Sequence, residues 1–163
     1  MAILDFKEIP EAGKASGQQD TFELFAREVL ELLGFKIIQG PSRGADGGKD
    51  LIVEETRIGV VGSTTLRWLV SCKHLVFGGK SVRPDDERNV FERVNAAGCG
   101  AFLGFYSTLP SSGLSELLHR QSIVQVKILD HEEIERHLLN SEGAATHTAL
   151  FPVVRKEVKA STR

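Results

Sequence analysis

Cysteine is scarce in this chain, and the scarcity argues against a metal site built from thiolates. Cys72 and Cys99 are the only cysteines among the 163 residues. A structural zinc site needs more ligands than two scattered cysteines supply. Both lie in apolar surroundings, so we expect buried free thiols of a protein kept in a reducing cytoplasm.

Long apolar runs are absent as well. No stretch approaches the roughly 20 residues needed to cross a bilayer. The first residues, Met-Ala-Ile-Leu-Asp, lack the basic and apolar regions of a secretory signal, so we expect a cytoplasmic protein. At 163 residues, with 41% hydrophobic and 26% charged residues, the chain fits one globular domain with a sizeable core.

Basic residues do not outnumber acidic ones either, because the formal net charge is −2. This value gives no argument for a nucleic-acid ligand. It does not exclude one, since a local basic face can attract phosphates on an otherwise acidic protein. Binding through such a face would depend strongly on salt.

The hydrophobic pattern predicts both helices and strands. Asp20 suits the N-cap of a first helix, in which apolar residues recur at helical spacing from Phe22 to the stop at Gly34. Ala101–Tyr106 is almost wholly apolar, as expected for a strand covered on both faces. The other expected elements are strands over 35–39, 49–54, 66–74 and 124–129, and helices from 84–86 to 98, from 111 or 112 to 121, and from 130 to 139.

This order predicts an α/β fold. Strands that follow one another directly favour antiparallel pairing, and the later alternation of helices and strands implies parallel strands with crossover helices. We therefore expect a three-layer core with a central mixed β-sheet flanked by helices, in the order αβββαβ plus αβα. Residues 1–17 are interpreted as a lead-in, 18–140 as the domain and 141–163 as a basic C-terminal extension, with a terminal strand over Leu150–Val154 as an alternative.

A carboxylate and an ammonium group can meet at one end of the predicted sheet. Asp50 opens one strand in the run Gly-Ala-Asp-Gly-Gly-Lys-Asp, and Lys73 closes the next in Val-Ser-Cys-Lys-His. Facing residues of an antiparallel hairpin have a constant sum of residue numbers, and a turn near 60–62 gives a sum of 121 to 123. Asp50 should therefore face the segment from Ser71 to Lys73. A purely structural ion pair across the hairpin is the alternative explanation.

These motifs resemble the Mrr-like restriction endonuclease branch of the PD-(D/E)xK nuclease superfamily. The likeness covers roughly residues 18–140 and includes Phe22-Glu23 in the first helix and Gly-Phe-Tyr-Ser-Thr at 104–108, besides the two runs just quoted. It implies a restriction-endonuclease-like fold and cleavage of DNA phosphodiester bonds with Mg²⁺, for which Mn²⁺ can substitute. By this likeness Asp50 matches the metal-binding aspartate, Lys73 the motif lysine and Glu23 the acid of the first helix.

Ser71 departs from the family pattern, because the family usually has glutamate there, or glutamine in many Mrr-like proteins. A serine hydroxyl is a weak neutral ligand, so the change bears directly on cleavage. Glu54 shares the strand face of Asp50 but lies about 13 Å along the strand, too far to replace the missing acid. Glu23 is the better candidate, although it also fits a capping box or a pair with Arg27.

The chemistry expected at this corner needs few protein ligands. Magnesium prefers oxygen and keeps several waters, so Asp50 and the main-chain carbonyl of Cys72 would suffice together with a substrate phosphate. Lys73 would hydrogen-bond the attacking water or the scissile phosphate. The candidate DNA contacts are Lys49, His74 and Lys80. A polar strand end and a solvated loop are the plainer explanations for the last two.

The sequence thus predicts a magnesium-dependent DNA endonuclease of the restriction or defence type. A catalytically impaired nuclease fold that binds DNA or serves in assembly is the alternative, and RNA or branched substrates stay open. No recognition helix or zinc finger is evident, so we expect weak sequence specificity or a partner recognition subunit. Cleavage of both strands requires two active sites, which favours a homodimer.

Overall fold

The computed structural model describes residues 4–11, 21–40, 51–120 and 124–140. Four α-helices and five strands follow one another within these ranges in the predicted order. They are α1 (Thr21–Leu32), β1 (Lys36–Gln39), β2 (Leu51–Gly59), β3 (Gly62–Lys73), α2 (Val90–Ala96), β4 (Ala101–Tyr106), α3 (Ser112–Arg120), β5 (Gln125–Leu129) and α4 (His131–Asn140).

The strands form one sheet in the order β1-β2-β3-β4-β5. β1 pairs with β2 and β2 with β3 in antiparallel fashion, whereas β3–β4 and β4–β5 are parallel pairs. The change of direction at β3 follows from the connections, because a short turn joins β2 to β3 while helices carry the chain between the later strands. The predicted mixed sheet is confirmed.

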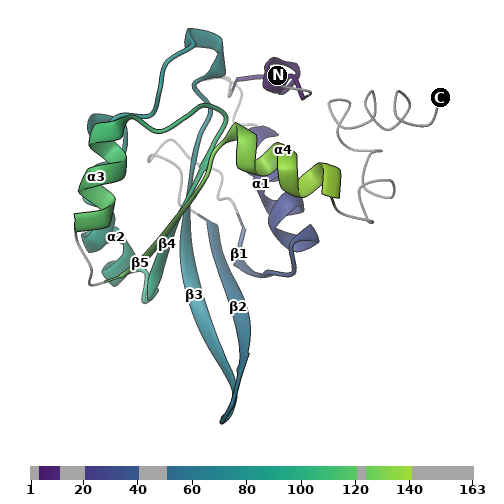
Figure 1. Ribbon diagram of the computed structural model, residues 1–163, viewed down its shortest axis with the longest axis vertical. Helices are drawn as coiled ribbons and strands as arrows, with labels where there is room; N and C mark the ends of the chain where they lie inside the picture. Colours follow the sequence, from purple (N-terminus) through teal and green to yellow (C-terminus); the bar gives the residue numbers. More distant parts are fainter. Residues whose placement is uncertain (1–3, 12–20, 41–50, 121–123, 141–163) are drawn as a thin grey trace, which may run out of the picture.

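Helices cover both faces of this sheet (Figure 1). On one face, α1 and α4 bury Phe22, Phe25 and Ile134 against β2, β3 and β4. On the other face, α2 and α3 bury Val94 and Leu114 against the same strands. Both faces of β4 are therefore covered, which explains why all six of its residues are buried. The predicted three-layer α/β architecture is confirmed.

The β2–β3 hairpin has the predicted register. Residue numbers of facing pairs add up to 121 along the whole ladder, from Leu51 with Val70 to Gly59 with Gly62. Val60 and Val61 form the two-residue turn, and Gly62 adopts a φ of 114° that favours glycine. Both strands are longer than expected, since they continue to this turn instead of ending at 54 and starting at 66.

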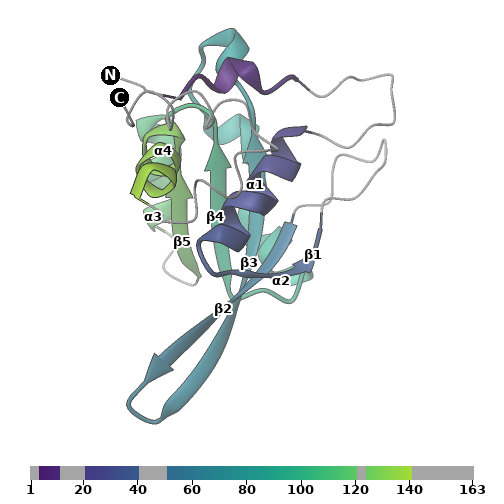
Figure 2. The ribbon, with the colours of Figure 1, turned by 90° about the vertical axis from the view of Figure 1, so that its right-hand side faces the viewer.

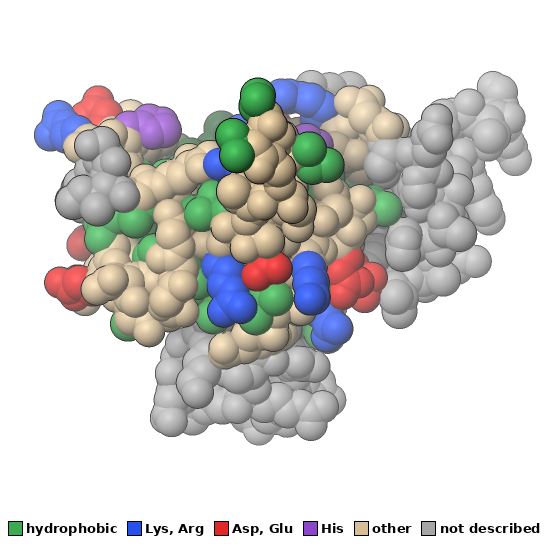
Figure 3. All heavy atoms as spheres, turned by 90° about the horizontal axis from the view of Figure 1, so that it is seen from below, with side chains coloured by type: hydrophobic (Ala, Val, Ile, Leu, Met, Phe, Trp, Pro, Cys, Tyr) green, Lys and Arg blue, Asp and Glu red, His purple; other side chains and the backbone are tan. Residues whose placement is uncertain are grey.

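The distal part of this hairpin protrudes beyond the helices (Figure 2). Residues 56–65 are all exposed, and Val60 and Val61 at the tip are fully so. Figure 3 looks toward the tip and shows hydrophobic side chains at its end, with charged side chains around its base. Burial of one face of a strand makes apolar and polar residues alternate along it. Residues 56–65 are exposed on both faces and lack this alternation, so the sequence did not predict a strand there.

α2 begins later than the predicted start at 84–86. Pro84–Asp86 forms a separate 3-10 turn, and Asn89 has a left-handed backbone with a φ of 52°. A left-handed residue cannot continue a right-handed helix, so α2 proper begins at Val90. The break places Glu87 in an irregular segment between the turn and the helix.

Residues 4–9 of the predicted lead-in pack into the core. Leu4, Phe6 and Ile9 are at most 4% exposed and belong to the apolar cluster beneath α1 and α4. Asp5 caps the short 3-10 helix over Phe6–Glu8 by accepting a hydrogen bond from the Lys7 N–H at 3.0 Å. The segment is therefore part of the folded unit.

Cys72 and Cys99 are not joined by a disulfide, and both are partly buried, where the sequence predicted full burial. Burial raises the pKa of the Cys99 thiol, and the nearby Arg67 charge opposes this only in part. No helix in the described ranges is both long and apolar enough to cross a bilayer.

Candidate active site

Ser71 and Lys73 project to the same side of the sheet. They follow Leu69 at intervals of two along β3, and Leu69 packs in the cluster beneath α2 and α3. Cys72 packs instead in the cluster beneath α1 and α4. The motif serine and the motif lysine therefore share the α2 side of the strand.

The end of β3 extends past the described part of β2. The last described pair of that ladder is Leu51 with Val70, so Ser71, Cys72 and Lys73 lie beyond it. On the β4 side the Lys73 carbonyl accepts a hydrogen bond from the Ser107 N–H at 3.1 Å. Backbone groups alternate in direction along a strand, so the carbonyl of Cys72 points toward the β2 side. A main-chain oxygen thus faces the corner where the sequence predicted metal binding.

A carboxylate that the sequence reading did not identify lies against Ser71. The Ser71 hydroxyl donates a hydrogen bond of 2.6 Å to Oε1 of Glu87. Both residues are buried, at 1% and 2% exposure. Arg93 on α2 donates to Oε2 of the same carboxylate at 3.0 Å, so the buried negative charge has a cationic partner. The sequence placed Glu87 only within the helix expected from 84–86 to 98 and assigned it no role.

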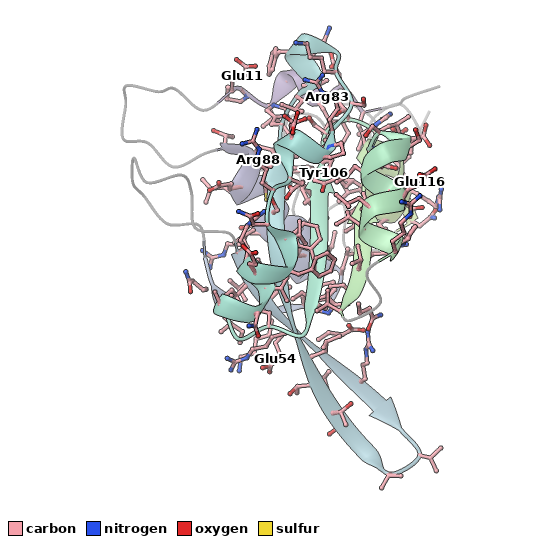
Figure 4. All side chains as sticks on the ribbon, turned by 90° about the vertical axis from the view of Figure 1, so that its left-hand side faces the viewer. Glu11, Glu54, Arg83, Arg88, Tyr106 and Glu116 are labelled. Atoms are coloured by element: carbon pink, nitrogen blue, oxygen red, sulfur yellow. The ribbon has the colours of Figure 1, made fainter. Side chains whose placement is uncertain are left out.

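Tyr106 completes this buried group from β4 (Figure 4). It pairs in register with Lys73 and is fully buried. Its hydroxyl lies beside the Glu87 carboxylate without forming a hydrogen bond of good geometry. Burial, followed by the negative charge of Glu87, raises the pKa of Tyr106 far above its usual range.

Gly104 makes room for the Tyr106 ring. It faces Ser71 across the β3–β4 ladder, and a Cβ at this position would lie 2.5 Å from Cζ of Tyr106. Any other residue would push the ring away from its place beside Glu87. Position 104 therefore requires glycine for steric reasons. The sequence alone did not reveal this requirement, because Gly104 lies within an apolar strand.

Glu23 lies on α1, the helix that covers the opposite face of the sheet from Ser71 and Lys73. Its neighbour Phe22 stacks on His74 with ring centroids 4.5 Å apart, so the first turn of α1 contacts the chain just after β3. Arg27, the possible partner named from sequence, pairs with Glu31 at 3.5 Å. The structure thus brings Glu23 to the same end of β3, but from the other side.

The residues predicted to contact DNA differ in how exposed they are and in their hydrogen bonds. Nε2 of His74 donates to the Ile9 carbonyl at 2.7 Å, which ties the N-terminal segment to the end of β3. Lys80 is exposed in the loop after the 3-10 turn Val76–Gly78. Lys49 and Asp50 lie outside the described residues, so their predicted roles stay predictions.

The described residues do not by themselves gather three or more His, Cys, Asp or Glu side chains that could hold a metal ion. The groups at the end of β3 are nevertheless oxygen donors, namely the Ser71 hydroxyl, the Glu87 carboxylate and the Cys72 carbonyl. Magnesium prefers this type of donor and completes its shell with water. The chemistry of the corner fits such an ion if one further carboxylate is supplied.

The sequence matches the model of one protein family, and the fold is similar to that of a solved structure. The sequence model of the Mrr catalytic domain, described as a restriction endonuclease, matches residues 15–138. No curated protein matches the chain. The solved structure of the DNA modification-dependent restriction endonuclease AspBHI superposes with a TM-score of 0.62 at 17% sequence identity, over 86% of this chain and 35% of AspBHI.

A second solved structure, the MspJI restriction endonuclease in complex with a 27-mer oligonucleotide, has a TM-score of 0.47 at 18% identity, over 80% of this chain and 30% of that chain. The present chain therefore spans about a third of the length of these two proteins. The likeness to AspBHI shows a shared fold.

Proposed function

Because this chain belongs to the Mrr-type restriction endonuclease family, we propose that it is a DNA endonuclease that hydrolyses phosphodiester bonds with a bound divalent metal ion. The observation that carries the proposal is the β2–β3 register. Facing residue numbers add up to 121, and the same register would bring Asp50 opposite Ser71, beside Lys73. A carboxylate, an ammonium group and a main-chain oxygen would then share one corner.

In this proposal Asp50 and the Cys72 carbonyl hold Mg²⁺, with Mn²⁺ as a substitute. The ion supplies Lewis-acid polarisation of the phosphate and a more acidic bound water. Lys73 orients the attacking water or the scissile phosphate, and its positive charge compensates the negative charge that grows in the transition state. Glu23 approaches from α1, the first turn of which contacts the end of β3.

The proposed contacts with the DNA backbone are Lys49, His74 and Lys80. Contacts to phosphates carry no base information, so sequence or modification specificity would come from a partner recognition subunit. Cleavage of both strands requires two active sites, and a homodimer with two-fold symmetry supplies them.

The test is cleavage of supercoiled plasmid by the purified protein with Mg²⁺ or Mn²⁺. We expect nicking by the wild type, loss of it in Asp50→Ala, and a reduction of at least about 100-fold in Lys73→Ala. Lys127→Ala is the matched control, because Lys127 is an exposed lysine on the edge strand β5. An inactive wild type, or equal cleavage by Asp50→Ala, would contradict the proposal.

A second candidate is a nuclease fold that binds DNA without cutting it. Ser71 favours it, because a buried neutral hydroxyl stands where a charged or amide ligand is expected. In that case the wild type would shift the fluorescence anisotropy of labelled duplex DNA without cleaving it, and Ser71→Glu or Ser71→Gln would gain cleavage. Robust turnover by the wild type would exclude this candidate.

A further inference from the structure

The protruding outer half of the β2–β3 hairpin, residues 56–65, is called the arm below. Val60 and Val61 form its tip, and both side chains are fully exposed. Two-residue hairpin turns favour glycine, asparagine and aspartate, so the geometry of the turn does not account for two consecutive valines. Neither valine is buried within the single chain. Apolar side chains gathered at a protruding point are typical of a surface that contacts another molecule.

A groove of about 550 Å³ lies at the base of the arm. Four apolar residues of the cluster beneath α1 and α4 line it, namely Phe35, Trp68, Leu103 and Leu129. Its volume is within the range of about 300–1,000 Å³ that is usual for binding sites. The tip cannot reach the groove of its own chain, because Val61 lies about 13 Å along the extended strand from Arg57 at the rim.

Three polar residues of the rim are paired with one another. Arg57 donates to the Glu55 carboxylate at 3.2 Å and to the side-chain oxygen of Gln125 at 2.9 Å. The same carboxylate accepts from the indole N–H of Trp68 at 2.9 Å. This part of the rim therefore needs no charged ligand, and the apolar lining suits a neutral apolar guest.

The composition of the arm favours a protein partner over DNA. Arg57 is the only charged residue of the arm, and it is already paired at the rim. Binding of DNA relies on cationic side chains that neutralise phosphates, and the arm offers no others. A neutral apolar tip instead matches the apolar groove that the same chain carries.

Two-fold symmetry makes this match reciprocal. If two copies lie antiparallel so that the tip of one reaches the base of the other, symmetry places the second tip in the first groove, whatever the length of the arm. The face of the arm that continues from Arg57 ends in the facing pair Gly59 and Gly62, which have no side chains. The partner's arm can therefore approach the backbone closely there.

The surface involved is large enough for a specific contact. The ten residues of the arm and the thirteen that line the groove share Thr56 and Arg57, so each copy contributes twenty-one residues. Stable interfaces of standard size use about 20–30 residues a side.

We propose that this chain dimerises by reciprocal exchange of its arms, with Val60 and Val61 of each copy seated in the groove of the other. The inference rests on the proposed function only in taking up the homodimer named there, to which it gives a contact surface. Lys73 lies about 26 Å along β3 from Thr65 at the base of the arm, so both candidate active sites stay uncovered.

Sedimentation velocity of the full chain, from about 1 to 100 μM, measures the association without DNA or metal. We expect a dimer for the wild type, and at least about 100-fold weaker association for the double variant Val60→Asp/Val61→Asp, because charges replace the central apolar anchors. Ile58→Asp is the matched control. Ile58 is an exposed apolar residue of the same arm, on the face that continues from Ile52 toward α2 and α3. Unfolding in dilute solution reports the single chain, in which the tip is exposed.

Disulfide trapping tests which surfaces meet. Oxidation of a mixture of the single variants Val61→Cys and Gln125→Cys should link two copies, because a disulfide requires Cα atoms within about 7 Å. Each variant oxidised alone should stay unlinked, since the two tips of an exchanged pair lie roughly 17 Å apart, the length of the arm. These single variants also control for Cys72 and Cys99, which are present in both.

The outcomes separate this inference from the proposed function. A wild type that is monomeric up to about 100 μM, or a dimer that Val60→Asp/Val61→Asp leaves intact, overturns the exchange of arms. Linkage of Val61→Cys to itself would show a tip-to-tip contact and would also overturn it. Loss of DNA binding in the double variant at unchanged mass would assign the arm to DNA instead. Plasmid nicking by the wild type decides the proposed function in each of these cases.

Discussion

Tyr106 and Glu87 show how single residues shape the buried side of this corner. The Tyr106 hydroxyl is buried without a well-formed hydrogen bond, beside a carboxylate that already has Ser71 and Arg93 as partners. Burial and the Glu87 charge both oppose ionisation of the phenol and raise its pKa. The folded protein therefore keeps Tyr106 neutral at a pH where an exposed tyrosine ionises.

This difference makes stability depend on pH in the alkaline range. The unfolded chain releases the Tyr106 proton above its ordinary pKa of 10.0, whereas the folded chain retains it. Stability from this group is thus complete below pH 10 and is lost as the pH rises beyond it. In Tyr106→Phe this loss is absent, so its free energy of unfolding relative to the wild type should rise by about 1.4 kcal/mol per pH unit above pH 10.

Urea unfolding of both proteins near pH 7 and near pH 11 measures the effect. Near pH 7 the variant should lie within about 1 kcal/mol of the wild type, because removal of an unsatisfied buried hydroxyl costs little. Parallel pH dependences of the two proteins would show that Tyr106 ionises as easily in the folded state as in the unfolded one.

Among the elements, the β2–β3 hairpin has two different environments along its length. Its proximal half is core, with Val53 and Val70 fully buried between the helical layers. Its distal half, residues 56–65, is exposed and extends beyond those layers. The constant register joins the two halves, so the turn at Val60 and Val61 determines which residues meet at the other end of the strands.

The hairpin therefore predicts opposite responses to substitution at its two ends. Val60→Lys and Val61→Lys should each change the free energy of unfolding by no more than about 0.5 kcal/mol, because both side chains are fully exposed. Val53→Ala should cost about 2 kcal/mol, since it leaves a cavity in the core. Chemical denaturation compares the three variants, and a large loss at the tip would mean that its valines are covered in solution.

The whole molecule is held together by contacts that are distant in sequence. The N-terminal segment packs beneath α1 and α4 through Phe6, which contacts Phe25 edge-to-face at 6.0 Å between ring centroids. His74 ties the same segment to β3 by its hydrogen bond with the Ile9 carbonyl. The end of β3, where the candidate active site lies, is thus braced by residues that precede the first helix.

Phe6→Ala tests whether this segment contributes to the fold as a whole. We expect a loss of about 3 kcal/mol in the free energy of unfolding, because a buried aromatic side chain is removed. Lys7→Ala, at the exposed neighbouring position, should stay within about 0.5 kcal/mol of the wild type. Equal unfolding midpoints of the two variants in urea would show that the segment is dispensable.

Local sequence patterns were enough to predict much of the secondary structure and the hairpin register. The apolar run Ala101–Tyr106 indicated a strand covered on both faces, and Asp130 was named as the start of the last helix, where its side chain accepts from the Glu133 N–H at 3.0 Å. The hairpin register followed from the turn expected near 60–62, and the observed pairs add up to 121. The basic extension over 141–163, like Asp50, lies outside the described residues. The site roles assigned to Lys73 and Glu23 stay predictions.

By itself the sequence determined the order of the elements, the strand directions and the alternation that puts Ser71 and Lys73 on one side of β3, because periodicity and turn residues act over short stretches of chain. Only the tertiary structure decided that Glu87 lies against Ser71 and that α1 brings Glu23 to the opposite face. No local pattern marks a charged residue for burial when its partners lie on another strand and helix. The contact exists because the chain passes from β3 to α2 and packs back onto the sheet, and that packing is a property of the whole fold.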